Sequence, residues 1–171
     1  MIKPTNMQHK LLSFTYLLTC LFCVSAQAKT NAQTIDWDAL IPKQTALSTP
    51  TNSAIVNHNG ERAPQKTDVA YRTDLDGKRV KIPGFVIPLE GDDKVVTELL
   101  LVPYYGACIH VPPPPANQIV YVKFKQGAPL QGLWDTVYIE GTLSVQTTES
   151  EFAQAGYLLD GIKVTAYTEA P

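Results

Sequence analysis

Hydrophobic and polar positions divide the chain into an apolar N-terminal stretch, a polar middle and a C-terminal part patterned for β-strands. The clearest strand is expected at residues 136–145, where Val137, Ile139 and Leu143 fall on one face. Residues 98–102 form an almost continuous apolar run, which predicts a strand buried on both faces. The other strands are expected at residues 78–89, 118–125 and 157–167.

Two of these predicted strands contain residues that bend a chain. Pro83-Gly84 indicates a bulge or sharp bend in a long curved strand, and Asp160-Gly161 indicates a turn or kink. Residues 148–155 are expected to form about two turns of helix. Five strands with little helix predict a mainly β fold, a small five-stranded OB-like barrel with an N-terminal arm and one short helix. A β-sandwich is the alternative.

The polar middle of the chain contains one apolar patch, at residues 35–42. Trp37, Leu40 and Ile41 share one face of a short helical turn, Asp36 is placed to cap it, and Pro42 ends it. We expect an arm whose tryptophan docks on the barrel. The predicted division is residues 1–28 as a signal peptide, 29–76 as the N-terminal arm and linker, and 77–171 as the barrel domain.

The signal peptide is predicted from the first 28 residues. Lys3 and Lys10 precede an apolar run at residues 11–26. Ala26 and Ala28 then supply small residues at the positions that a signal peptidase recognises. The run is shorter than the roughly 20 residues that a membrane-spanning helix needs. We therefore expect a periplasmic mature protein with no stable membrane span.

Removal of that signal changes the charge and the cysteine count. It leaves 12 basic and 16 acidic side chains, and the net charge of about −4 disfavours nucleic acid as a partner. Cys20 and Cys23 are lost with it, so Cys108 is the single cysteine of the predicted mature chain. A single cysteine in an exported protein indicates a buried thiol, an intermolecular disulfide or a metal-bound thiolate.

The most distinctive residues lie between two predicted strands. Cys108 and His110 are two residues apart, so in an extended chain their side chains point to the same side. Thiolate and imidazole are preferred ligands of zinc and copper, although a closed zinc site needs four ligands. A buried cysteine near an unrelated histidine is the alternative interpretation.

Four consecutive prolines follow this pair and predict a stiff polyproline segment that cannot join a β-ladder. Tyrosines and amides flank the prolines, and together they form a candidate surface for a partner protein. The candidate partner-binding residues are Tyr104, Tyr105, Pro112, Pro113, Pro114, Pro115, Asn117 and Gln118.

Four segments of the chain resemble DUF3299, a family of exported bacterial proteins of unknown function. The segments are IDWDALIP at residues 35–42, IPGFVIPLE at 82–90, LLVPYYGACIHVPPPPANQ at 100–118 and VYIEGTL at 137–143. The resemblance implies an OB-like fold. It also implies a role in periplasmic metal handling, because family members look like companions of a MacB-like ABC transporter and a His-rich periplasmic protein at zinc-responsive loci.

The residues and the resemblance together predict a non-enzymatic periplasmic accessory protein. It is expected to bind zinc, or copper, through Cys108 and His110 and to work with the periplasmic face of an ABC transporter or its metal-binding companion. One alternative is an interaction module without metal that uses the polyproline loop and the barrel surface. Another is an enzyme with Cys108 as nucleophile, for which His110 is poorly placed as a general base.

Overall fold

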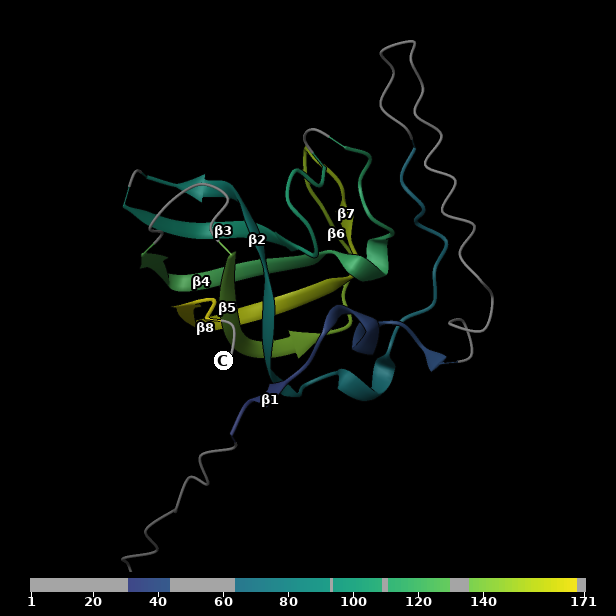
Figure 1. Cartoon of the computed structure of the whole chain (residues 1–171), viewed down its shortest axis with the longest axis horizontal. Coiled ribbons are helices and arrows are strands. Elements are labelled where there is room, and N and C mark those ends of the chain that lie inside the picture. The colour runs from purple at the N-terminus through teal and green to yellow at the C-terminus, as the bar shows by residue number, and fades with distance from the viewer. Residues whose placement is uncertain (1–30, 44–63, 93, 109–110, 130–135, 169–171) are drawn as a thin grey trace, which may run out of the picture. The chain divides into compact units, whose positions relative to one another are not determined.

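Five long strands build the protein. The structure is a computed structural model that describes residues 31–43, 64–92, 94–108, 111–129 and 136–168. The long strands are β2 (Arg79–Gly91), β3 (Val95–Val102), β4 (Val120–Pro129), β5 (Thr136–Ser144) and β8 (Tyr157–Ala166). Their order is β2-β3-β4-β8-β5, and β5 pairs back with β2, so the sheet closes into a barrel (Figure 1). The predicted mainly β, five-stranded OB-like barrel is confirmed.

The barrel closes because β2 curves and pairs with two strands, β5 and β3 (Figure 1). Its first half, from Arg79 to Phe85, pairs with β5, and its second half pairs with β3. Gly84 lies at this change of partner, where a Cβ atom would be 2.8 Å from the carbonyl oxygen of Val102. Pro83-Gly84, the pair predicted to bend the strand, therefore occupies the position where β3 comes too close for a side chain.

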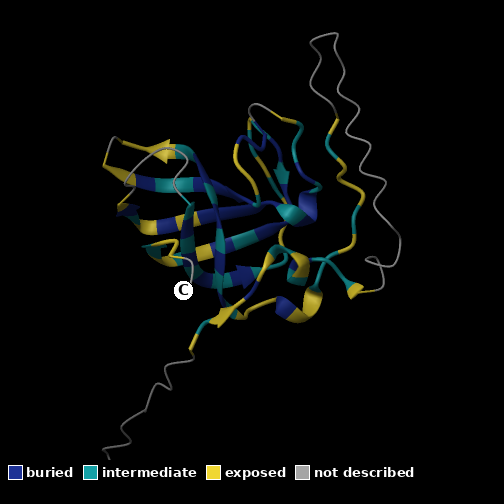
Figure 2. Ribbon diagram, viewed as in Figure 1, coloured by how far each residue is buried: buried dark blue, intermediate teal, exposed yellow. Residues whose placement is uncertain are grey.

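The wall formed by β2, β3, β4 and β8 is apolar on both faces. One row of residues that are paired across these four strands points into the barrel: Val86, Leu101, Val120 and Tyr157. The adjacent row of paired residues points away from the barrel interior into a second apolar cluster, which we call the outer cluster: Ile87, Leu100, Tyr121 and Leu158. Successive strand residues point to opposite faces, so the C-terminal half of β3, Leu99 to Val102, is buried on both sides, as its apolar run predicted (Figure 2).

A small ladder of β6 (Thr148–Glu149) and β7 (Gln154–Ala155) stands where a helix was predicted at residues 148–155. That prediction is wrong. Ser150 Oγ accepts hydrogen bonds from the Phe152 and Ala153 N–H groups and donates to the Ala153 carbonyl, so the chain turns instead of winding. The helices in the described part of the chain are three 3₁₀ turns, η1 (Trp37–Leu40), η2 (Thr73–Leu75) and η3 (Ala116–Gln118).

The N-terminal arm docks on the barrel through its tryptophan, as predicted. After β1 (Gln33–Thr34) adds to β2 in parallel, the indole Nε1 of Trp37 donates to the Pro83 carbonyl at 2.8 Å. Leu40 is completely buried in the cluster that fills the barrel. Asp36 precedes η1, but its side chain makes no capping hydrogen bond, contrary to expectation.

The predicted signal peptide, residues 1–28, lies outside the described residues. Within the described ranges, no helix has the length and apolar character required to cross a membrane.

Candidate functional site

The predicted site residues lie in the connection from β3 to β4, residues 103–119, which we call the connecting loop. Tyr104, Tyr105 and Val111 expose 43%, 60% and 42% of their surface. The Tyr105 ring packs edge-on against Phe85, with 6.1 Å between ring centroids, and the Tyr104 hydroxyl donates to the Pro112 carbonyl at 3.3 Å. The loop sequence contains no Asp, Glu, Lys or Arg. Its described residues therefore present an uncharged surface of tyrosine and valine side chains.

Cys108 lies beneath this surface. Its side chain is completely buried in the outer apolar cluster, and burial together with the neighbouring Cys108 raises the pKa of Tyr104. Its backbone φ of +67° makes it the single non-glycine residue in the left-handed region within the described ranges. Such a conformation costs about 1 kcal/mol for a residue with a Cβ atom. Cys108 is therefore not extended, and the geometric reason for its convergence with His110 does not apply at this residue.

A complete metal site is not present among the residues that the structure describes, because no three His, Cys, Asp or Glu side chains gather there in a suitable way. A closed zinc site needs four ligands. His110 and His58 lie outside the described residues. Of the predicted pair, the described residues thus supply one candidate ligand, the Cys108 thiol.

The amides at the end of the connecting loop are used within the chain. The Asn117 side chain is buried and donates to the Ala70 carbonyl at 3.0 Å. The Gln118 side chain donates to the Trp37 carbonyl at 2.9 Å. Both amides hold the N-terminal arm, and Pro114 is buried as well. The predicted partner-binding residues that remain at the surface are Tyr104, Tyr105, Pro112, Pro113 and Pro115, and Val111 is exposed as well.

One residue that the sequence did not indicate, Gln65, fastens the connecting loop from the other side. Its Nε2 donates to the carbonyls of Pro114 at 3.0 Å and Gln154 at 2.8 Å. Its Oε1 accepts from the Gln154 N–H at 2.8 Å. Gln65 lies in a polar stretch without periodicity, and its partners are backbone groups, so no sequence pattern indicates these contacts.

A polar triad borders the outer cluster on β3 and β4. Glu98 accepts hydrogen bonds from the Tyr121 hydroxyl and from Lys123 Nζ, the latter at 2.9 Å. These two hydrogen bonds lower the pKa of Glu98, and the bond from Tyr121 has the larger effect. Burial raises the pKa of Tyr121 to about 12. Glu98 is therefore charged and Tyr121 neutral at physiological pH, so neither is suited to proton transfer there.

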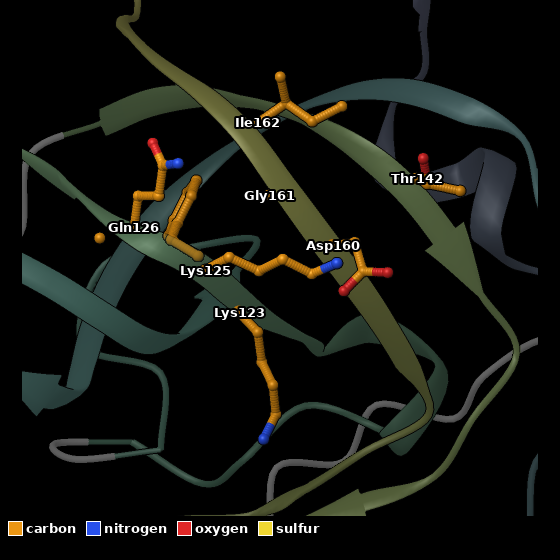
Figure 3. A pocket seen from close by; sticks show the side chains of 9 residues that line it. Lys123, Lys125, Gln126, Thr142, Asp160, Gly161 and Ile162 are labelled. Carbon is orange, nitrogen blue, oxygen red and sulfur yellow. The ribbon is translucent and has the colours of Figure 1, made fainter.

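A hollow of about 460 Å³ opens on another part of the barrel, where β4 and β8 separate beyond the pair Lys123–Asp160 (Figure 3). The Lys125 side chain extends across it in the direction of Asp160. Gly161 pairs with Gly141 while Lys163 pairs with Glu140, which leaves a bulge in β8 and confirms the predicted irregularity. The hollow shares no lining residue with the connecting loop.

Comparison with known proteins identifies the family. Residues 37–166 match DUF3299, described as a protein of unknown function. A crystal structure of a DUF3299 family protein from Pseudomonas aeruginosa PAO1, at 2.45 Å resolution, is 39% identical and superposes with a TM-score of 0.68. The match covers 82% of this chain and 99% of that chain. No curated protein matches. The matched range includes Trp37, the connecting loop and all five barrel strands, and the chain belongs to the DUF3299 family.

Proposed function

We propose that the chain is a non-enzymatic periplasmic accessory protein that binds a protein partner through the connecting loop. The partner is the periplasmic part of an ABC transporter or its metal-binding companion. The observation that carries this proposal is the exposure of Tyr104, Tyr105 and Val111 on a proline-rich loop that has no Asp, Glu, Lys or Arg. The partner surface is accordingly apolar and uncharged.

The physics of interfaces supports this use of the loop. Tyrosine is enriched at protein interfaces and loses little conformational entropy when it is bound. The two tyrosines are already held, one by Phe85 and the other by Pro112, and the polyproline segment restricts the backbone. A preorganised surface loses less entropy on binding than a mobile one.

Replacing Tyr105 by serine is expected to weaken binding to the purified periplasmic domain of the transporter about tenfold, because tyrosine is enriched among the interface residues whose truncation costs more than about 1 kcal/mol. Isothermal titration calorimetry measures the change. Ile162→Ser is the matched control, since Ile162 is 55% exposed on β8 and lies outside the loop. Equal affinities for the unaltered chain and both variants, or no binding by any of them, would contradict the proposal.

A second candidate function, metal handling, is favoured by the backbone of Cys108. A left-handed conformation at a residue other than glycine is a strain that often marks a functional site. Cys108 stands two residues before His110, beneath the surface that faces the partner. We propose that the two side chains bind zinc, or copper, at a shared site, where the partner, or water while the chain is alone, supplies the remaining ligands. An incomplete ligand set suits transfer of the metal to or from the partner, because the ligands that the partner supplies can also be withdrawn.

Offered zinc or reduced copper, the mature chain is then expected to retain about one metal ion per chain or per dimer, and Cys108→Ser and His110→Ala are expected to lose it. Elemental analysis of the protein, purified without a histidine tag, gives the metal content. His58→Ala is the control for loss of any histidine. Retention of the metal in both site variants, or no retention by the unaltered chain, would contradict the metal-handling function. Binding of a protein partner would then be the single remaining proposal.

A further inference from the structure

Two separate parts of the chain cover the outer apolar cluster in which Cys108 is buried. One is the connecting loop, and the other is the β6–β7 ladder. Ala155 of β7 and Ala153 of the turn before it belong to the same cluster as Cys108. Both parts lie at the same end of the barrel in Figure 1. Access to the Cys108 thiol therefore depends on what keeps the loop and the ladder together.

Gln65 joins these two covers. A single side-chain amide donates to Pro114 of the loop and both donates to and accepts from the backbone of Gln154 in the ladder. The next residue adds a bond, since the Lys66 carbonyl accepts from the Ala116 N–H at 3.0 Å. Further along, the Ala70 carbonyl accepts from Asn117. We call residues 64–70 the strap.

Hydrogen bonds hold the strap against the loop and the ladder. Most of its residues are exposed, and none of them belongs to either apolar cluster. A hydrogen bond near water contributes little net free energy, whereas the barrel is held by two apolar clusters. Segments with few buried apolar contacts open locally while the rest of a protein stays folded. The strap is thus the part of this cover that opens first.

We propose that the strap is a latch, with Gln65 as its fastening residue, and that its release gives access to Cys108. When Gln65 leaves, Pro114 and Gln154 lose their shared partner. The connecting loop stays attached to the chain after β7 at Ala116, whose carbonyl accepts from the Gly156 N–H at 2.8 Å, and the part of the loop before Ala116 separates from the β6–β7 ladder. Thiol accessibility is then set by an equilibrium between a fastened and a released strap. This inference goes beyond the proposed function and holds without any partner or metal.

The test is the rate at which iodoacetamide alkylates Cys108, read by mass spectrometry of the peptide that contains this residue. Gln65→Ala is expected to raise the rate about tenfold, because three hydrogen bonds that favour the fastened strap are lost. Gln65→Glu keeps the shape and the bond from the Gln154 N–H but cannot donate to either carbonyl, so it is expected to raise the rate as well. Thr67→Ala, at an exposed strap position, is the matched control and should react like the unaltered chain.

Urea distinguishes release of the latch from loss of the fold. Local opening exposes little surface, so the raised rate should depend weakly on low urea concentrations, whereas global unfolding gives a steep dependence. An unchanged rate in both Gln65 variants would overturn the proposal. So would a raised rate whose urea dependence equals that of global unfolding, or an equal increase in Thr67→Ala.

Discussion

Replacing Tyr157 by phenylalanine is expected to destabilise the protein by about 3 kcal/mol, since one buried and one part-buried backbone group lose their partner. The Tyr157 hydroxyl accepts from the Arg72 N–H at 2.8 Å and donates to the Leu40 carbonyl at 2.7 Å. The side chain is completely buried, and burial raises the pKa of Tyr157, so the phenol stays neutral. The hydroxyl connects the barrel to the N-terminal arm at two points, and phenylalanine would preserve only the ring packing.

Urea unfolding of the unaltered chain and of Tyr157→Phe measures this loss as a lower midpoint. Tyr71→Phe is the matched control, because the partly buried Tyr71 packs its ring edge-on against Tyr157 at 5.7 Å between centroids. A change of at most about 0.5 kcal/mol is expected there. If both variants lose the same small amount of stability, the hydroxyl of Tyr157 is not the tie between arm and barrel.

Replacing Gly141 by alanine is expected to cost about 3 kcal/mol, because the added methyl group has no space. An ideal Cβ at this position would lie 2.4 Å from the Asp160 carbonyl oxygen and 2.8 Å from Leu159 Cγ. Both neighbours belong to β8, which is paired with β5 on this side and with β4 on the other. The backbone of β8 therefore cannot move away without breaking pairs that close the barrel.

The control for this second substitution is Gly77→Ala. Nothing lies within 4 Å of a Cβ at Gly77, but its φ of +70° is left-handed, so the expected cost is about 1 kcal/mol of backbone strain. Thermal unfolding followed by circular dichroism compares the two variants. A loss at Gly141 no larger than that at Gly77 would show that β8 yields and that close packing at Gly141 does not limit stability.

Both proposed functions meet at the connecting loop, with the tyrosines on its surface and Cys108 beneath. A latch at Gln65 would let partner binding and thiol access influence each other, because the same loop carries both. A partner that binds the loop more tightly when the strap is released would shift the equilibrium of the strap toward release by the same factor by which release strengthens binding.

Much of the fold could be predicted from local pattern alone. The alternation of Val137, Ile139 and Leu143 placed β5 and its buried face, since a strand with one buried face needs a period of two. Pro83-Gly84 and Gly161 marked the irregular positions of β2 and β8, because few residues other than glycine allow a backbone to approach so closely. Trp37 stood out as an aromatic residue in a polar stretch.

The candidate site was decided by contacts between distant residues. Gln65 lies 89 residues from Gln154, and a side chain that bonds to backbone leaves no periodic trace in the sequence. Ser150 produced a turn where composition suggested a helix, because its hydroxyl competes for the local backbone groups. The left-handed backbone of Cys108 and the inward orientation of Asn117 depend on the packing of the connecting loop against the arm and the outer cluster. The sequence by itself thus determined the strands and their bends, which follow from local backbone preferences and burial, whereas only the tertiary structure decided which side chains of the loop are exposed and which are buried.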